Sequence, residues 1–338
     1  MQSNKVRKFN NIPLSVLDTA PIIEGGSTGQ TYRNSVELAQ HVEKWGFNRY
    51  WLAEHHNMPG IGSSATSVLI GHIAGATERI RVGAGGIMLP NHAPLVIAEQ
   101  FGTLESIYPG RIDLGLGRAP GSDQATAYAL RRTLQSSGDD FPEQLAELEM
   151  FFEANPEARV RAVPGEGMKI PIWLLGSSGF SAQLAAHKGL PFSFASHFAP
   201  AYVLQAMQLY HQNFKPSKVL KEPYAMLGVN VIAAETDEKA EWLATSQQLQ
   251  FLSITTGKPS LLRPPVDNMD AHWSPHEKAS IGKTLDPRTT IVGSPETVKR
   301  KLESFIHETK ANELIINTQI YNQEDRLHSY EILAEMMN

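Results

Sequence analysis

The chain has 338 residues, of which 41% are apolar and 19% charged, and a formal net charge of −5, an ordinary globular composition. It contains no cysteine, so disulfides, thiolate nucleophiles and cysteine-ligated zinc or iron–sulfur centres are excluded. No basic patch stands out, no apolar run is long enough to span a membrane, and residues 1–11 lack the apolar core of a signal peptide. We therefore expect a cytoplasmic protein that binds neither nucleic acid nor membrane.

Short apolar runs alternate with longer amphipathic runs along the chain. The first four apolar runs end near Asp18, His55, Met88 and Gly117, which are 37, 33 and 29 residues apart, the size of one strand–helix unit. The predicted strands cover residues 13–18, 50–53, 80–89, 112–117, 171–175, 191–196, 225–234 and 313–317.

The intervening segments carry apolar residues at helical spacing, as in residues 32–45, where Gly46 then ends the helix. The predicted helices cover residues 32–45, 64–77, 95–108, 181–188, 201–213, 237–252, 295–309 and 326–337. Strand–helix alternation implies parallel strands with right-handed crossovers. Eight strands in this order favour an α/β fold of the closed (β/α)₈ TIM-barrel type over an open sheet.

Two excursions interrupt the alternation within what we expect to be one domain, residues 1–338. Residues 118–169 are long and partly helical, with a predicted helix over residues 142–154, and residues 257–292 are rich in proline and polar residues. In a barrel, insertions of this kind commonly lie at the C-terminal face, over the mouth of the active site. The alternative is a surface loop without a role.

Active sites of barrels lie where the strands end, so the residues at those points are the candidate site. Glu54, His55 and His56 end the second predicted strand, and an imidazole there can act as a base or hydrogen-bond donor near neutral pH. The alternative is a pair of buried structural histidines. Residues 83–86 (GAGG) lie inside the third strand and indicate the close approach of a flat group or, alternatively, tight core packing.

Two successive strand ends carry the parts of an anion site. Residues 115–121 (GLGRAPG) do not match a dinucleotide-binding fingerprint, because the glycine spacing is wrong and Pro120 stands where the helix should begin. Their arginine is a cation suited to a phosphate, or else part of a surface salt bridge. Residues 177–181 (SSGFS) open the next helix, whose free amides and hydroxyls suit an anion, although the serines can also be plain N-caps. The candidate phosphate-binding residues are Arg118, Ser177, Ser178, Gly179 and Ser181.

A metal site is not expected. His272 and His276 are four residues apart, but Ser274 and Pro275 between them break a helix, so the two side chains do not share a helical face.

Together these motifs resemble the bacterial luciferase-like, FMN-dependent monooxygenases, and more closely the non-luminescent oxidoreductases of that superfamily. The resemblance covers nearly the whole chain. The segments that carry it are Tyr50–His56, Ile87–Pro90, Ala98–Gln100, Pro109–Arg111 and Gly117–Asp123.

The resemblance implies roles for individual residues. His55 corresponds to the strand-two histidine that assists flavin chemistry, with His56 beside it as a second candidate, and Gly85–Gly86 corresponds to a non-prolyl cis peptide beneath the isoalloxazine ring. Arg118 and the serine turn correspond to the phosphate-binding residues. Light-emitting members carry a cysteine just before that arginine, where this chain has Gly117, so the resemblance does not extend to light emission.

The implied activity is that of a monooxygenase, which uses reduced FMN and O₂ to oxygenate a small organic substrate, aldehyde- or ketone-like. No nicotinamide-binding domain is visible, so we expect a separate flavin reductase to supply FMNH₂, and the resemblance also implies a homodimer. Two alternatives stay open: a deazaflavin-dependent dehydrogenase on the same barrel, and a non-catalytic flavin-binding protein, against which the histidines of the second strand argue.

Overall fold

The computed structural model describes residues 5–119, 124–131 and 140–338. Parallel strands form a closed barrel in the order β3–β4–β5–β6–β7–β8–β10–β2, and the pairing of β2 with β3 closes it. The barrel strands are β2 (Ile12–Asp18), β3 (Arg49–Leu52), β4 (Arg81–Met88), β5 (Ile112–Gly117), β6 (Ile172–Gly176), β7 (Phe192–Phe194), β8 (Ala225–Ala233) and β10 (Glu313–Asn317). The expected TIM barrel is confirmed, and each predicted strand is present.

Two strands were not predicted. β1 (Lys8–Phe9) pairs antiparallel with β2, and β9 (Thr290–Gly293) pairs parallel with the far end of β8, outside the barrel. Each is short, and neither alters the barrel itself.

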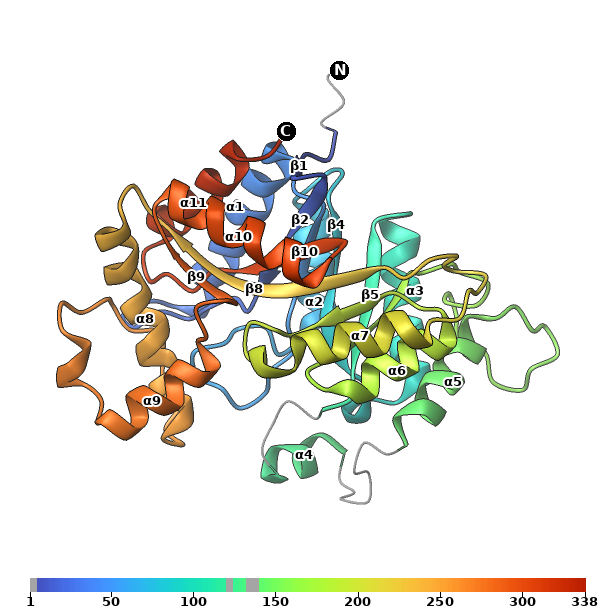
Figure 1. Cartoon of the computed structure of the whole chain (residues 1–338). Helices are drawn as coiled ribbons and strands as arrows, with labels where there is room; N and C mark the ends of the chain where they lie inside the picture. Colours follow the sequence, from blue (N-terminus) through green and yellow to red (C-terminus); the bar gives the residue numbers. More distant parts are fainter. Residues whose placement is uncertain (1–4, 120–123, 132–139) are drawn as a thin grey trace.

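Helices surround the barrel (Figure 1). They are α1 (Thr28–Trp45), α2 (Thr66–Gly75), α3 (Pro94–Ile107), α4 (Gln124–Arg131), α5 (Phe141–Phe152), α6 (Gly179–Lys188), α7 (Val203–Asn213), α8 (Asp237–Thr255), α9 (Pro275–Thr284), α10 (Pro295–Thr309) and α11 (Gln323–Glu335). Three short 3₁₀ turns, η1 (Leu89–Asn91), η2 (Pro200–Tyr202) and η3 (Met269–Ala271), complete the described elements. Gly46 ends α1 as predicted, because its left-handed backbone (φ 86°) lets its N–H return to the carbonyls of Val42 and Glu43.

The inside of the barrel is filled by a separate apolar cluster, distinct from the core between strands and helices. Trp51 of β3 and Trp173 of β6 meet edge to face, with their ring centroids 5.2 Å apart. These strands are not neighbours in the barrel, so the contact crosses the lumen. Because side chains alternate along a strand, residues two positions from Trp51 also face inward, among them Ala53 of the same cluster.

A buried ion network forms the floor of the barrel, at the N-terminal ends of the strands. The Arg49 guanidinium lies 2.7 Å from Asp113 and 3.1 Å from Glu313, and Arg81 lies 2.6 Å from Asp113. Both carboxylates are fully buried, and their attraction raises the pKa of Arg49 in spite of its burial. The two positive and two negative charges therefore neutralise one another at the N-terminal end of the barrel.

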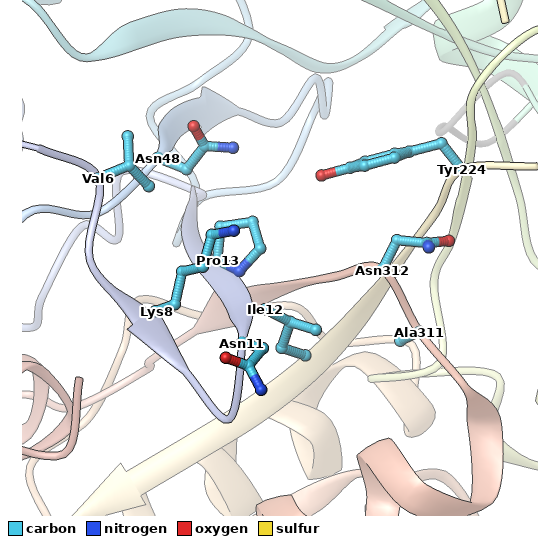
Figure 2. Close-up of a pocket in the computed structure, with 9 residues that line it drawn as sticks. All are labelled: Val6, Lys8, Asn11, Ile12, Pro13, Asn48, Tyr224, Ala311 and Asn312. Carbon is cyan, nitrogen blue, oxygen red and sulfur yellow. The ribbon is translucent and has the colours of Figure 1, made fainter. Parts of the chain in front are cut away.

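A pocket of about 490 Å³ lies beneath this floor (Figure 2). Two of its polar side chains bond to the floor: the Tyr224 hydroxyl donates to Glu313 at 2.8 Å, and the Asn48 amide donates to the same carboxylate at 2.9 Å. In TIM barrels this end of the strands serves stability rather than catalysis. The pocket is therefore not the candidate site.

The excursion over residues 257–292 is anchored at the opposite, C-terminal face. The Leu262 amide donates to the Ile22 carbonyl at 2.9 Å, and the Ile22 amide donates to the Gly60 carbonyl at 3.0 Å, which joins the excursion to the loops after β2 and β3. The excursion also contains α9, where Ser274 and Glu277 form a capping box. Since α9 begins at Pro275, the expected break between His272 and His276 is present.

In the described parts of the chain, no helix is both long and apolar enough to cross a membrane. The same residues contain no group of three or more histidine or acidic side chains arranged to hold a metal ion.

Candidate functional site

Bare backbone lines the lumen along β4 and β5. A Cβ atom on Gly85 would lie 2.8 Å from the Leu17 side chain, and one on Gly86 would lie 2.8 Å from the Gly115 carbonyl. A Cβ on Gly115 would lie only 2.1 Å from the Ala84 carbonyl, so no side chain fits at these positions. The Gly85–Gly86 peptide bond is cis, as predicted, at the point where the register of β4 and β5 shifts. The result is a stretch of strand without side chains of its own, against which Leu17, Trp51 and Leu175 pack.

His55 lies three residues beyond the end of β3, at the C-terminal mouth of the barrel. Its Nδ1 atom is inaccessible and has no hydrogen-bond partner. Burial lowers the pKa of His55 in spite of the nearby Glu54 charge, so the ring is neutral at pH 7. A neutral imidazole with no partner is free to accept a proton from a ligand or to donate one to it.

His56, in contrast, is hydrogen-bonded within the protein. Its Nε2 atom lies 2.8 Å from the carboxylate of the buried Glu54, which also accepts from His92 at 2.9 Å and from the Met88 amide at 3.0 Å. Burial alone would raise the pKa of Glu54, but the hydrogen bonds from both histidines and the amide outweigh it and lower the pKa to about 2. This group, Glu54 with His56 and His92, ties the end of β3 to η1 and is called the Glu54 clamp below.

Arg118 lies against the first turn of α6, the helix that the serine turn opens. The Arg118 guanidinium lies 4.3 Å from the centroid of the Phe180 ring, in the first turn of α6. No ion pair joins Arg118 to a carboxylate among the described residues. Ser178 is the N-cap of α6, but its hydroxyl makes no capping bond, and Gly179 opens the helix with its first free amides. A cation therefore lies against the first turn of a helix whose N-cap hydroxyl is unbonded.

The remaining predicted residues have different surroundings. Ser181 is buried against Gly176, where an added Cβ would lie 2.7 Å from the serine Cβ, while Ser177 is half-buried at the end of β6. Residues 120–123, the end of the segment Gly117–Asp123, lie outside the described residues.

Sequence reasoning missed His92 and His197, which also follow strand ends. His92 comes directly after η1 at the end of β4, and His197 lies three residues beyond β7. The rule that selected His55, an imidazole within a few residues of a predicted strand end, would have selected both. His197, like His55, has a buried Nδ1 without a partner.

The closed barrel, with its candidate residues at the C-terminal ends of the strands, defines a class of protein, the enzymes of the α/β-barrel type. Residues 13–313 match the family of luciferase-like monooxygenases. The chain belongs to this family, and with it to the oxidoreductases.

Relatives and a solved structure agree with this assignment. The chain is 58% identical to the uncharacterized protein YvbT of Bacillus subtilis (strain 168), with coverage of 99% of this chain and 98% of YvbT. It is 53% identical to a luciferase-like monooxygenase of Escherichia coli (strain K12), covering 96% and 97% of the two chains. It is 32% identical to the N-acetyl-S-alkylcysteine monooxygenase of Bacillus subtilis (strain 168), covering 96% and 98%. The crystal structure of apo-MsnO8 superposes with a TM-score of 0.86 at 34% identity, covering 96% and 98%.

Proposed function

We propose that this protein uses reduced FMN and O₂ to oxygenate a small, uncharged organic substrate, aldehyde- or ketone-like. The observation that carries the proposal is the stacking of Arg118 on Phe180 at the uncapped start of α6, at the end of the strand that pairs with the glycine-rich β4. An anion site next to a surface for a flat ring matches a group with a phosphate at one end and a tricyclic ring at the other.

The residues present fit FMN. Arg118, Ser178 and the first amides of α6 would bind the phosphate, and the Gly85–Gly86 backbone would contact the ring. His55, neutral at pH 7, would hold or move a proton at its imidazole during oxygen transfer. The apolar cluster below, with Trp51 and Trp173, excludes water from this end of the lumen.

Bound reduced FMN supplies two electrons, so that one atom of O₂ enters the substrate and the other leaves as water. Residues 115–121 do not match the dinucleotide-binding fingerprint of a nicotinamide site, so we propose that a separate reductase delivers FMNH₂. We also propose that residues 1–338 form a single domain and that two copies associate through α2 and α3.

The test is a binding and labelling experiment. The purified protein is titrated with FMN, riboflavin and the deazaflavin F420, and is then supplied with chemically reduced FMN, ¹⁸O₂ and a panel of aldehydes and ketones. We expect preference for FMN and one ¹⁸O atom in a product detected by mass spectrometry. Preference for F420 with unlabelled product would instead establish a dehydrogenase, and binding of FMN without any product across the panel would favour a flavin carrier.

A further inference from the structure

The backbone around His197 is held firmly in place by β8. The Ser196 hydroxyl donates to the Gly228 carbonyl at 2.6 Å, and the Asn230 amide donates to the His197 carbonyl at 2.8 Å. Asn230 is itself fixed by Thr290 of β9 and by Asn317 of β10. Three strands therefore position one residue at the mouth of the barrel.

The His197 ring itself has no partner among the described residues. Its Nδ1 atom is inaccessible and unbonded, and a Cβ on Gly228 would lie 2.2 Å from it, so the ring packs directly on the bare backbone of β8. The Phe198 ring covers another side, with centroids 4.8 Å apart. A buried polar atom left without a hydrogen bond destabilises the fold. An imidazole whose backbone is fixed by hydrogen bonds and whose ring has no partner indicates a ligand-binding role.

His197 and His55 approach the lumen from opposite sides. In the closed order of strands, β3 and β7 are separated by three strands in either direction, so they lie across the barrel from each other. Burial lowers the pKa of His197 to about 4, so its ring, like that of His55, is neutral at pH 7. Asn317 of β10 adds a third buried polar atom, Oδ1, without a partner.

Apolar side chains fill the lumen, and the one carboxylate that acts on His55, Glu54, is bonded to other partners. These apolar side chains include Trp51, Trp173 and Met226, and the neighbouring Asn230 is neutral. The carboxylate of Glu54 is already saturated by the Glu54 clamp. A ligand here would meet hydrogen-bonding groups without a counter-charge, which suits a carbonyl oxygen and disfavours a carboxylate or ammonium group.

We propose that His197 is a substrate-binding residue, whose imidazole hydrogen-bonds the oxygen of an uncharged carbonyl substrate across the lumen from His55. This inference rests on the proposed function, because it assigns a substrate contact within the same site. His55 would then act at the flavin side of the lumen and His197 at the far side.

The test compares His197→Leu, which removes the hydrogen bond, with His197→Gln, which keeps an amide donor and acceptor. In the labelled-oxygen assay with cyclohexanone as the probe, we expect His197→Leu to raise KM about tenfold or more, with a smaller change in kcat, and His197→Gln to recover part of it. FMN affinity, measured by fluorescence titration, should stay within twofold of wild type in both variants. Gly228→Ala, which displaces the ring while retaining the histidine, should raise KM in the same way.

Two results would overturn the inference: unchanged KM in His197→Leu, or a loss of FMN affinity as large as that in Arg118→Ala, which would make His197 a flavin contact. Thermal melts identify any variant that fails to fold, and Gly228→Ala then decides. A second readout needs no turnover. Imidazole ¹⁵N shifts of the flavin-free protein are followed on titration with cyclohexanone and with cyclohexanecarboxylate, and movement of His197 with the ketone alone is expected. If wild type shows no oxygenation, the proposed function fails, while this titration still decides the role of His197.

Discussion

At the scale of single residues, the position of Arg118 carries a strong functional implication. Its guanidinium stacks on Phe180 beside an uncapped helix start, and no described carboxylate competes for it. Charge-assisted hydrogen bonds to a phosphate contribute about 1–3 kcal/mol. We therefore predict that Arg118→Ala weakens FMN binding about 10- to 100-fold and leaves riboflavin binding unchanged, as measured by flavin fluorescence titration.

A matched control for this variant is Arg161→Ala, since Arg161 pairs with Glu166 in the excursion before β6 and has no part in the anion site. It should bind both flavins like wild type. Equal losses for FMN and riboflavin in Arg118→Ala would remove the phosphate assignment.

The two adjacent histidines are predicted to behave differently. His55 has an unbonded, buried Nδ1 in the lumen, whereas His56 is bonded to Glu54. General acid–base assistance is worth about 10²–10⁴ in rate, so His55→Ala should reduce single-turnover oxidation by that order and leave FMN affinity nearly intact. His56→Ala should lower the melting temperature more than the rate. The reverse pattern in stopped-flow and melting experiments would exchange the two roles.

Sequence reasoning located single residues when they followed a strand end, as His55 and Arg118 do. It could not predict which side chains from different strand ends contact one another. Phe180 beneath Arg118 and His92 on Glu54 come from other strand ends, and whether such residues meet depends on register and on the exact path of a turn. The unbonded state of His197 is likewise a property of packing, which no local pattern contains.

At the scale of elements, the Glu54 clamp joins β3 to η1, next to the bare wall of β4. The folded-state pKa of Glu54, about 2, lies below the ordinary value, so the carboxylate stabilises the fold above about pH 4.5. This stabilisation is lost as pH falls from there toward 2. We predict that Glu54→Gln lowers the free energy of unfolding by on the order of 3 kcal/mol at pH 6, and that the difference from wild type shrinks in urea titrations at pH 4 and pH 3.

Glu149→Gln is the control for this pH dependence. Glu149 makes a partly exposed ion pair with Lys188 at 2.7 Å, an arrangement that contributes little to stability. A difference between wild type and Glu54→Gln that stays constant from pH 6 to pH 3 would contradict an ionised Glu54 as its source.

Burial imposed a period on the elements that were predicted, whereas α4, α9, β1 and β9 were missed. The eight barrel strands and their helices each carry an apolar face, so their order could be read directly. α9 has a single buried residue, Ile281, and depends on the capping box of Ser274 and Glu277 instead. β9 has only four residues and pairs with β8 beyond the barrel. Capping signals in the excursion were present in the sequence, but hydrophobic periodicity was absent.

At the scale of the whole molecule, α2 and α3 expose an unusual surface. Val68 is 69% exposed, Ile107 59% and Val96 42%, and α2 contains no charged residue other than a histidine. Such a surface is typical of an interface between copies. We predict a homodimer in sedimentation experiments at micromolar concentration, and a monomer of 37.3 kDa for Val68→Glu.

The control for the dimer is Val219→Glu, which adds the same charge at an equally open site, 57% exposed, in the loop before β8. It should remain dimeric. A wild-type protein that sediments as a monomer would refute the interface outright.

The buried ion network at the floor of the barrel also affects how substrate and product enter and leave. It consists of Arg49, Arg81, Asp113 and Glu313. Because the N-terminal end of the barrel is closed, every molecule that enters the lumen must leave it through the C-terminal mouth. A cofactor bound at that mouth by Arg118 would control the entry of substrate into the lumen and the exit of product from it. Arrival and departure would then follow a compulsory sequence, with the kinetics of an ordered mechanism rather than those of independent, random encounters.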